Sequence, residues 1–236
     1  MSGITFLNNI QLALILNIET ATTNCSVSLS KDGKTLILKE DNDKSYSHAE
    51  RLHVYIGAIL NEANVSSKDL DAISVSKGPG SYTGLRIGVS AAKGLCFALD
   101  KPLISIATLE ALARQVEANE GVIVTMLDAR RMEVYSAIYD SDYNQLRETQ
   151  AQILDESAFA EYLEKGKVYF IGNGVEKTKS LISHPNAIFI EDKLPSANEM
   201  SLLAYNKYKK SDTEDVAYFE PYYLKDFVAL KPKSKS

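Results

Sequence analysis

Residues 77–88 read Lys-Gly-Pro-Gly-Ser-Tyr-Thr-Gly-Leu-Arg-Ile-Gly, and this stretch decides the fold. A short apolar run, Ala72–Val75, precedes it, and apolar residues at helical spacing follow in Leu85–Leu99. The pattern predicts a strand, a tight glycine loop and a helix. Because the first amides of a helix lack partners within it, such a junction either holds an anion or seats another chain against bare backbone.

The composition limits the classes of protein to which the chain can belong. Its 236 residues suffice for one large domain or two small ones, and its net charge of −5 argues against an autonomous nucleic-acid binder. Cys25 and Cys96 fall in a predicted strand and a predicted helix, a pattern typical of buried, reduced thiols. The first basic residue is Lys31, and the apolar run at 12–18 is too short for a secretory signal or a membrane span. We expect a cytoplasmic protein without a membrane partner.

The chain divides into two similar halves. We expect an extension at 1–11, a first subdomain at 12–107, a second subdomain at 108–225 and a flexible tail at 226–236. The last helix of the second subdomain could pack either on its own subdomain or back on the first. The predicted elements of the first half are strands at 12–20, 25–30 and 35–39, a helix at 48–64 with Ser47 as its cap, a strand at 72–75, a helix at 85–99 and a strand at 103–106. Those of the second half are a helix at 108–116, strands at 122–128, 133–139 and 146–150, a helix at 156–164, a strand at 168–171, a helix at 175–183, a strand at 187–190 and a helix at 198–208. Two successive β-β-β-α-β-α cycles predict a duplicated α/β fold with mixed sheets.

Three segments carry a resemblance to a known family: Ile15–Thr22, the loop at 78–88, and Asp128-Ala129-Arg130-Arg131. On these residues the chain resembles the TsaB (YeaZ) family, the bacterial partner subunit of the tRNA threonylcarbamoyladenosine synthase complex, over residues 12–225. Glu19 departs from the aspartate usual in the family. The resemblance implies a duplicated actin/Hsp70-type fold and a larger catalytic paralogue, TsaD. It also implies docking of a small ATPase, TsaE, and contact with tRNA only through the complex.

The resemblance separates this chain from its paralogue at the metal site. The paralogue's mark is a His-x-x-x-His pair on the helix after the first subdomain, where spacing of four places both rings on one face. The matching positions here hold Thr108 and Leu112. The three histidines, His48, His53 and His184, form no such pair, and His48 and His53 are interpreted as surface residues of a helix. We therefore expect no metal site and no catalytic residues.

The predicted nucleotide site has lost its glycines. Actin-like ATPases open each half with an acid and a glycine that admits phosphate, whereas this chain has Glu19, Thr20 and Thr22 without a glycine. The second half repeats the turn at Asp128, again with alanine where a glycine would admit phosphate. The role of Asp128 is equally explained by a structural ion pair with Arg130 and Arg131. Gly172-Asn173-Gly174 is either a phosphate cradle or a plain turn. We expect no cofactor, with weak ATP or ADP binding at a subunit interface left open.

Two neighbouring helices are predicted to form a partner interface. The second helix carries many small residues, which allow another helix to approach closely. Each internal glycine destabilises the helix by about 0.5–1 kcal/mol relative to alanine, so several of them need a reason. The candidate interface residues are Val54, Tyr55 and Ala58 on the first helix and Gly84, Arg86, Gly88, Ala91 and Ala92 on the second. The alternatives are packing within the domain and, for Arg86, an internal ion pair or a contact with tRNA.

The favoured function is a non-catalytic scaffold subunit. It would pair with TsaD, or with itself as a homodimer when TsaD is absent, for threonylcarbamoyl transfer to the adenosine next to the anticodon. The alternative is a small actin-fold ATPase or kinase with its own nucleotide turnover.

Overall fold

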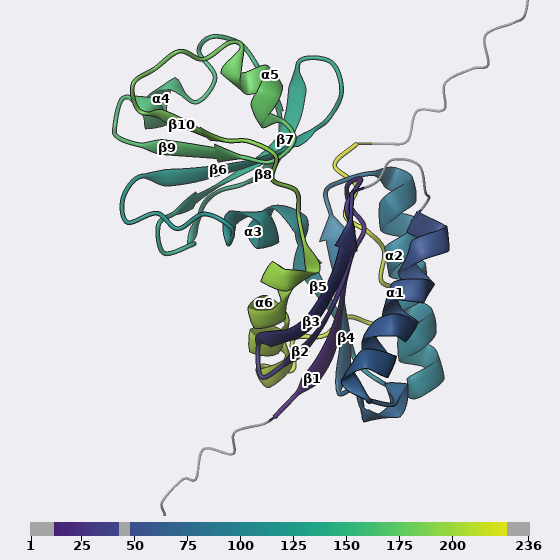
Figure 1. Ribbon diagram of the computed structural model, residues 1–236. Helices are drawn as coiled ribbons and strands as arrows, with labels where there is room; N and C mark the ends of the chain where they lie inside the picture. Colours follow the sequence, from purple (N-terminus) through teal and green to yellow (C-terminus); the bar gives the residue numbers. More distant parts are fainter. Residues whose placement is uncertain (1–11, 43–47, 226–236) are drawn as a thin grey trace, which may run out of the picture.

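The computed structural model describes residues 12–42 and 48–225, which Figure 1 draws in colour. The predicted extension at 1–11, the predicted cap Ser47 and the predicted tail at 226–236 lie outside these residues. The described chain forms two five-stranded sheets with helices packed on them.

The elements follow the predicted order. Those of the first half are β1 Leu14–Glu19, β2 Cys25–Lys31, β3 Lys34–Asp41, α1 His48–Ala63, the short 3-10 helix η1 Ser67–Asp69, β4 Ala72–Gly78, α2 Tyr82–Leu99 and β5 Leu103–Ala107. Those of the second half are α3 Thr108–Ala113, β6 Val122–Asp128, β7 Glu133–Asp140, β8 Gln145–Ile153, α4 Ala160–Leu163, β9 Val168–Ile171, α5 Val175–Lys179, β10 Ala187–Ile190 and α6 Ala197–Lys209.

The two sheets share one topology. The first has the order β3-β2-β1-β4-β5, and the second, followed from its other edge, has the order β8-β7-β6-β9-β10. In each sheet the first three strands of the half pair antiparallel, and the remaining two join in parallel. The predicted duplicated actin/Hsp70-like fold with mixed sheets is therefore confirmed.

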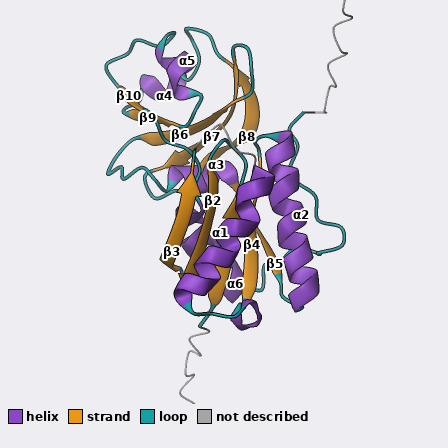
Figure 2. Cartoon of the chain, turned by 45° about the vertical axis from the view of Figure 1, so that its right-hand side comes forward, coloured by secondary structure: helices purple, strands orange, loops and turns teal. Residues whose placement is uncertain are grey.

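Helices cover both faces of each sheet (Figures 1 and 2). On the first sheet, α1 and α2 pack over one face around Leu52 and Ile59, and α6 packs over the other around Met200. On the second sheet, α4 and α5 share a core with Phe170, and α3 packs on the opposite face through Leu112. Because α6 contacts β1, β2 and β5, the chain returns to the first subdomain after completing the second sheet.

Several predicted boundaries were wrong for local reasons. α2 begins at Tyr82 rather than at residue 85, because the Ser81 hydroxyl accepts a hydrogen bond from the Gly84 amide and caps the helix. α4 is confined to Ala160–Leu163, since Phe159 before it has a left-handed backbone with φ 65°. α3 and α5 are also shorter than predicted, and β8 is longer. Among the described helices, none is long and apolar enough to cross a bilayer.

Candidate docking surface

The glycine loop closes on the turn that follows β1. A Cβ atom added at Gly84 would lie 2.1 Å from the Thr20 carbonyl oxygen, and one added at Gly80 would lie 2.5 Å from the Ala21 carbonyl oxygen. The Thr20 hydroxyl donates to the Gly84 carbonyl at 2.8 Å, and the Ser81 amide donates to the Ala21 carbonyl at 2.7 Å. The loop therefore uses its bare backbone to bind its own chain.

This packing narrows the predicted interface. Gly84, Gly88 and Ala92 are buried within the subdomain, so they do not lie on the outer surface of α2. Gly88 faces Thr20, and Ala92 belongs to the core beneath α1 and α2. These three residues therefore pack within the domain, which was the alternative to a partner interface. Their small size lets the turn after β1 and the sheet approach the helix closely.

Glu19, the last residue of β1, is fully buried. Its Oε1 accepts hydrogen bonds from the Ala21 amide at 2.6 Å and the Ser76 hydroxyl at 2.8 Å, while Oε2 has no partner. Burial raises the pKa of this carboxyl from 4.5 to about 7, although the hydrogen bonds to its oxygens oppose the shift. Glu19 therefore fixes the turn from inside the protein.

The hydroxyls of the same turn are also engaged. Thr20 is buried and bound to Gly84, as described above, and Thr22 is buried and accepts from the Asn24 amide at 3.3 Å. The Thr22 carbonyl oxygen lies 2.6 Å from His48 Nε2. His48, predicted to be a surface residue of a helix, begins α1 and is half-buried, and its ring joins the helix to this turn.

The second predicted turn, at Asp128, has a different ion pair from the one expected. Asp128 binds Lys177 at 2.7 Å, whereas Arg130 reaches the Asp128 carboxylate only through its backbone amide, also at 2.7 Å. Lys177 further donates to the Arg131 carbonyl at 2.9 Å and to the Glu133 carbonyl. The predicted ion pair with the two arginines was wrong because Lys177, from α5, takes their place.

The glycine turn at 172–174 braces β6. The Asn173 side chain accepts from the Asp128 amide at 2.8 Å, and a Cβ atom at Gly172 would lie 2.0 Å from the Met126 carbonyl oxygen. The contacts are those of a plain turn. No hydrogen bond or ion pair within residues 12–42 and 48–225 joins Asp128 to Glu19, so the candidate nucleotide contacts form two separate groups.

The positions that match the paralogue's ligand pair lie in the interior. Leu112 packs against the second sheet, and Thr108 is buried with a hydroxyl that has no partner. Over the described part of the chain, no group of three or more His, Cys, Asp or Glu residues is placed to hold a metal ion.

The outer surface of α1 and α2 exposes apolar side chains. Val54 on α1 is 64% exposed, and Tyr55, Ala58 and Ala91 are half-buried. Phe97 on α2, which the sequence pattern did not single out, is 86% exposed. Residue 97 follows the exposed positions 86, 90 and 94 at helical spacing. This spacing could have indicated that Phe97 lies on the exposed side of α2.

Arg86 is also exposed, but it forms no ion pair within the described residues. Its guanidinium donates to the Tyr82 hydroxyl at 2.6 Å and lies 5.2 Å from the centre of the same ring. Of its three predicted roles, the internal ion pair was therefore wrong.

Comparison with known proteins identifies relatives over nearly the whole chain. Residues 42–233 match the family model described as "TsaD: tRNA N6-adenosine threonylcarbamoyltransferase". The "tRNA threonylcarbamoyladenosine biosynthesis protein TsaB" of Escherichia coli is 31% identical over 92% of this chain and 96% of its own length. The protein of the same name from Bacillus subtilis is 33% identical over 71% of this chain and 74% of its own length.

A solved structure shows the same fold. The solved structure described as "YeaZ from Pseudomonas aeruginosa" superposes with a TM-score of 0.76 at 26% identity, covering 90% of this chain and all of that one. The sequence matches and this superposition agree on one family. The chain belongs to the TsaB (YeaZ) family of tRNA threonylcarbamoyladenosine biosynthesis proteins.

Proposed function

We propose that this protein serves tRNA threonylcarbamoyladenosine biosynthesis as a non-catalytic subunit that docks a TsaD-type catalytic subunit through α1 and α2. The observation that carries the proposal is the exposure of Val54 and Phe97, at 64% and 86%, on two neighbouring helices of one face. When a partner covers a large apolar side chain that is so exposed, the burial of its surface stabilises the complex. Ala58, one turn after Val54 on α1, and Ala91 on α2 are small and half-buried, so they would allow a second helix pair to approach closely.

The packing around Glu19 supports a role without chemistry. The glycine loop contacts residues 20 and 21, and Glu19 is enclosed with Ser76 and the Ala21 amide. An acid that is to orient a metal-bound nucleotide needs an open path to its oxygens. Weak ATP or ADP binding would therefore belong to a surface completed by a partner subunit.

The remaining assignments follow the same scheme. A TsaE-type ATPase would dock on the complex, tRNA would be bound only through the complex, and the apolar face would mediate a homodimer when the catalytic subunit is absent. The expected compartment is the cytoplasm. The homodimer would use the same α1–α2 surface as the catalytic subunit and would therefore compete with it.

Reconstitution tests the function directly. The catalytic subunit from the same genome is assayed for tRNA modification alone, with this chain, and with its Glu19→Gln variant. The proposal predicts that modification requires the chain and that Glu19→Gln retains activity. ATP hydrolysis by the purified chain that disappears in Glu19→Gln would instead support the alternative of an active ATPase or kinase.

A further inference from the structure

The C-terminal segment 214–225 forms a strap across both subdomains. Its backbone is held at Glu214 by the Leu103 carbonyl at 2.8 Å and at Tyr222 by the Lys77 carbonyl at 2.7 Å. Lys93 of α2 donates to two further carbonyls of the strap, and Lys225 at its end pairs with Glu133 of β7. The strap therefore has a fixed path from the first sheet to the second.

The strap presents tyrosine rings to solvent. Tyr218 is 84% exposed, Tyr222 45% and Tyr223 38%. They line an open hollow of about 640 Å³ together with one cation, Lys77, and two acidic residues, Glu214 and Glu220. The Tyr223 ring lies 5.1 Å from the ring of Tyr82, the first residue of α2, measured between centroids. Rings held in this way by backbone bonds are preorganised to stack on flat groups.

The strap ends beside a hairpin tip with two arginines. Arg130 and Arg131 connect β6 and β7 with left-handed backbones, at φ 68° and 50°. Asparagine and glycine are the residues that adopt this conformation readily. Both arginines are exposed, and their guanidinium groups have no hydrogen bond or ion pair within the described residues. A strained tip that keeps two free cations is typical of a binding function.

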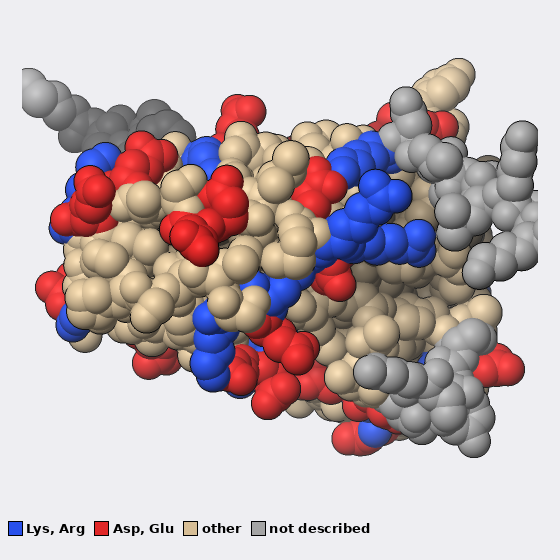
Figure 3. Space-filling model, turned by 90° about the horizontal axis from the view of Figure 1, so that it is seen from above, with Lys and Arg blue, Asp and Glu red and all other residues tan. Residues whose placement is uncertain are grey.

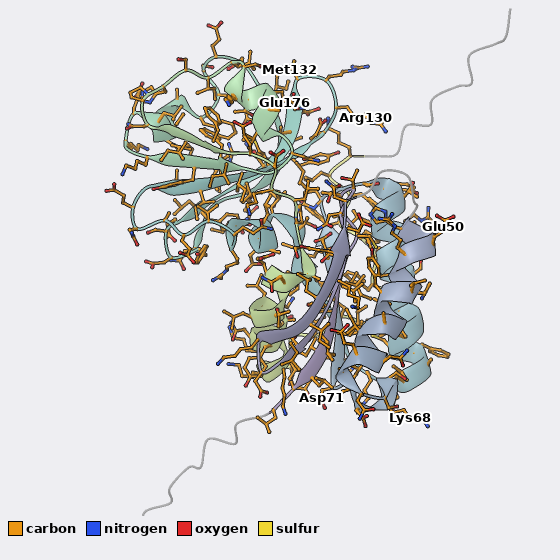
Figure 4. All side chains as sticks on the ribbon, in the orientation of Figure 1. Glu50, Lys68, Asp71, Arg130, Met132 and Glu176 are labelled. Carbon is orange, nitrogen blue, oxygen red and sulfur yellow. The ribbon has the colours of Figure 1, made fainter. Side chains whose placement is uncertain are left out.

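The tip and the strap are physically connected. Lys177 binds the Arg131 and Glu133 carbonyls and so braces the hairpin, and Glu133 pairs with Lys225 of the strap. Figure 4 shows Arg130 projecting outward from the second subdomain. Seen from above, several lysine and arginine side chains lie close together, with aspartate and glutamate side chains around them (Figure 3).

We propose that the tyrosines of the strap and the arginines of the hairpin tip form a docking surface for single-stranded RNA. Unpaired bases would stack on Tyr218 and Tyr222, and backbone phosphates would bind Arg130 and Arg131. Aromatic rings next to cations are the combination that binds single strands, since each base has a flat face and each phosphate a charge. The inference rests on the proposed function in tRNA modification and assigns to this chain its own contact with an unpaired loop.

A direct binding assay tests the surface. A fluorescent RNA stem-loop is titrated with the full chain alone and with the chain bound to its catalytic subunit, over a series of salt concentrations. Arg130→Ala combined with Arg131→Ala is expected to reduce the slope of log affinity against log salt by about 1.4, the value for two contacts to single-stranded phosphates. Tyr222→Ala is expected to weaken binding about 5- to 150-fold, the range for one stacked base, whereas Tyr222→Phe retains it.

Matched controls separate this surface from general charge attraction. Lys209→Ala with Lys210→Ala removes the same charge from the exposed end of α6 and should leave the affinity and slope unchanged. The inference is overturned if this control weakens binding as much as the arginine pair does, if a fully paired duplex or polyglutamate competes as well as the stem-loop, or if neither preparation binds RNA. The arginine variant should still co-elute with the catalytic subunit, so loss of RNA binding is distinguished from failure of the subunit pairing.

Discussion

Gly88 of α2 and Thr20 of the turn after β1 are in direct contact: a Cβ atom added at Gly88 would lie 2.2 Å from the Thr20 hydroxyl oxygen. One turn earlier on α2, the carbonyl of Gly84 accepts the hydrogen bond of the same hydroxyl at 2.8 Å. Two glycines thus allow a helix to lie against a polar turn. The loss of helix propensity is offset by the closure of the subdomain.

Alanine at Gly88 should destabilise the protein. The added methyl group must displace Thr20, and overpacking of this kind costs about 1–3 kcal/mol in the free energy of unfolding. Gly94→Ala is the control, since no atom lies within 4 Å of a Cβ added there. It should stabilise the protein by about 0.5–1 kcal/mol. Denaturant unfolding measures both, and Thr20→Ala combined with Gly88→Ala should cost less than the sum of the two single changes.

The stability of the protein should depend on the charge of Glu19. Its pKa is about 7 in the folded chain and close to 4.5 when unfolded. Between these two values the unfolded chain has released the proton and the folded chain has kept it, so stability falls as pH rises and levels off above about 7. The glutamine of Glu19→Gln is neutral throughout. The unfolding free energy of this variant, relative to that of the wild type, should therefore rise by on the order of 3 kcal/mol between pH 4.5 and pH 8. A difference in unfolding free energy that does not vary with pH would contradict this explanation.

Removal of the Lys177 amine should open the hairpin tip. The ammonium group binds the Asp128 carboxylate and the carbonyls of Arg131 and Glu133, and methionine provides none of these bonds. Limited trypsin digestion is expected to cleave after Arg130 or Arg131 faster in Lys177→Met than in the wild type. Lys179→Met, which loses only an exposed pair with Glu191, is the control and should be cleaved at the wild-type rate at these two sites.

The two cysteines should be unreactive in the native protein. Both are buried and free, and burial raises the pKa of Cys25 to about 11 and that of Cys96 to about 12. Since the thiolate is the nucleophile, a disulfide reagent at pH 8 should modify neither thiol until denaturant is added. Rapid modification of either thiol in the folded chain would show that the core around it opens.

The sequence was sufficient to predict the order of elements and the duplicated topology. Short apolar runs indicated the buried strands. The pair Asp32-Gly33, a sequence that favours two-residue hairpins, joins β2 to β3 with φ 53° and 80°. The helix ends were harder, because the left-handed conformation of Phe159 follows from tertiary packing rather than from its own preference.

The site was predicted less well than the fold. Small residues on α2 indicated a close approach but not its direction, so Gly84 and Gly88 were assigned to a partner although they contact Thr20. The Lys177 ion pair joins residues 49 positions apart, and no local pattern encodes that distance. Phe97 was overlooked because an apolar residue in an apolar helix gives no sign of its exposure.

Co-elution with the catalytic subunit tests the docking surface most directly. Val54→Glu with Phe97→Glu places two charges on the outer surface of α1 and α2 and should alter the unfolding free energy of the monomer by no more than about 0.5 kcal/mol each. Leu146→Glu with Ile153→Glu, at two exposed apolar positions of β8, is the matched control. In size-exclusion chromatography of equimolar mixtures, we predict that the first variant elutes apart from the TsaD-type subunit while the control and the wild type elute with it. A full-strength complex of the Val54→Glu, Phe97→Glu variant would contradict the assignment of α1 and α2 as the docking surface.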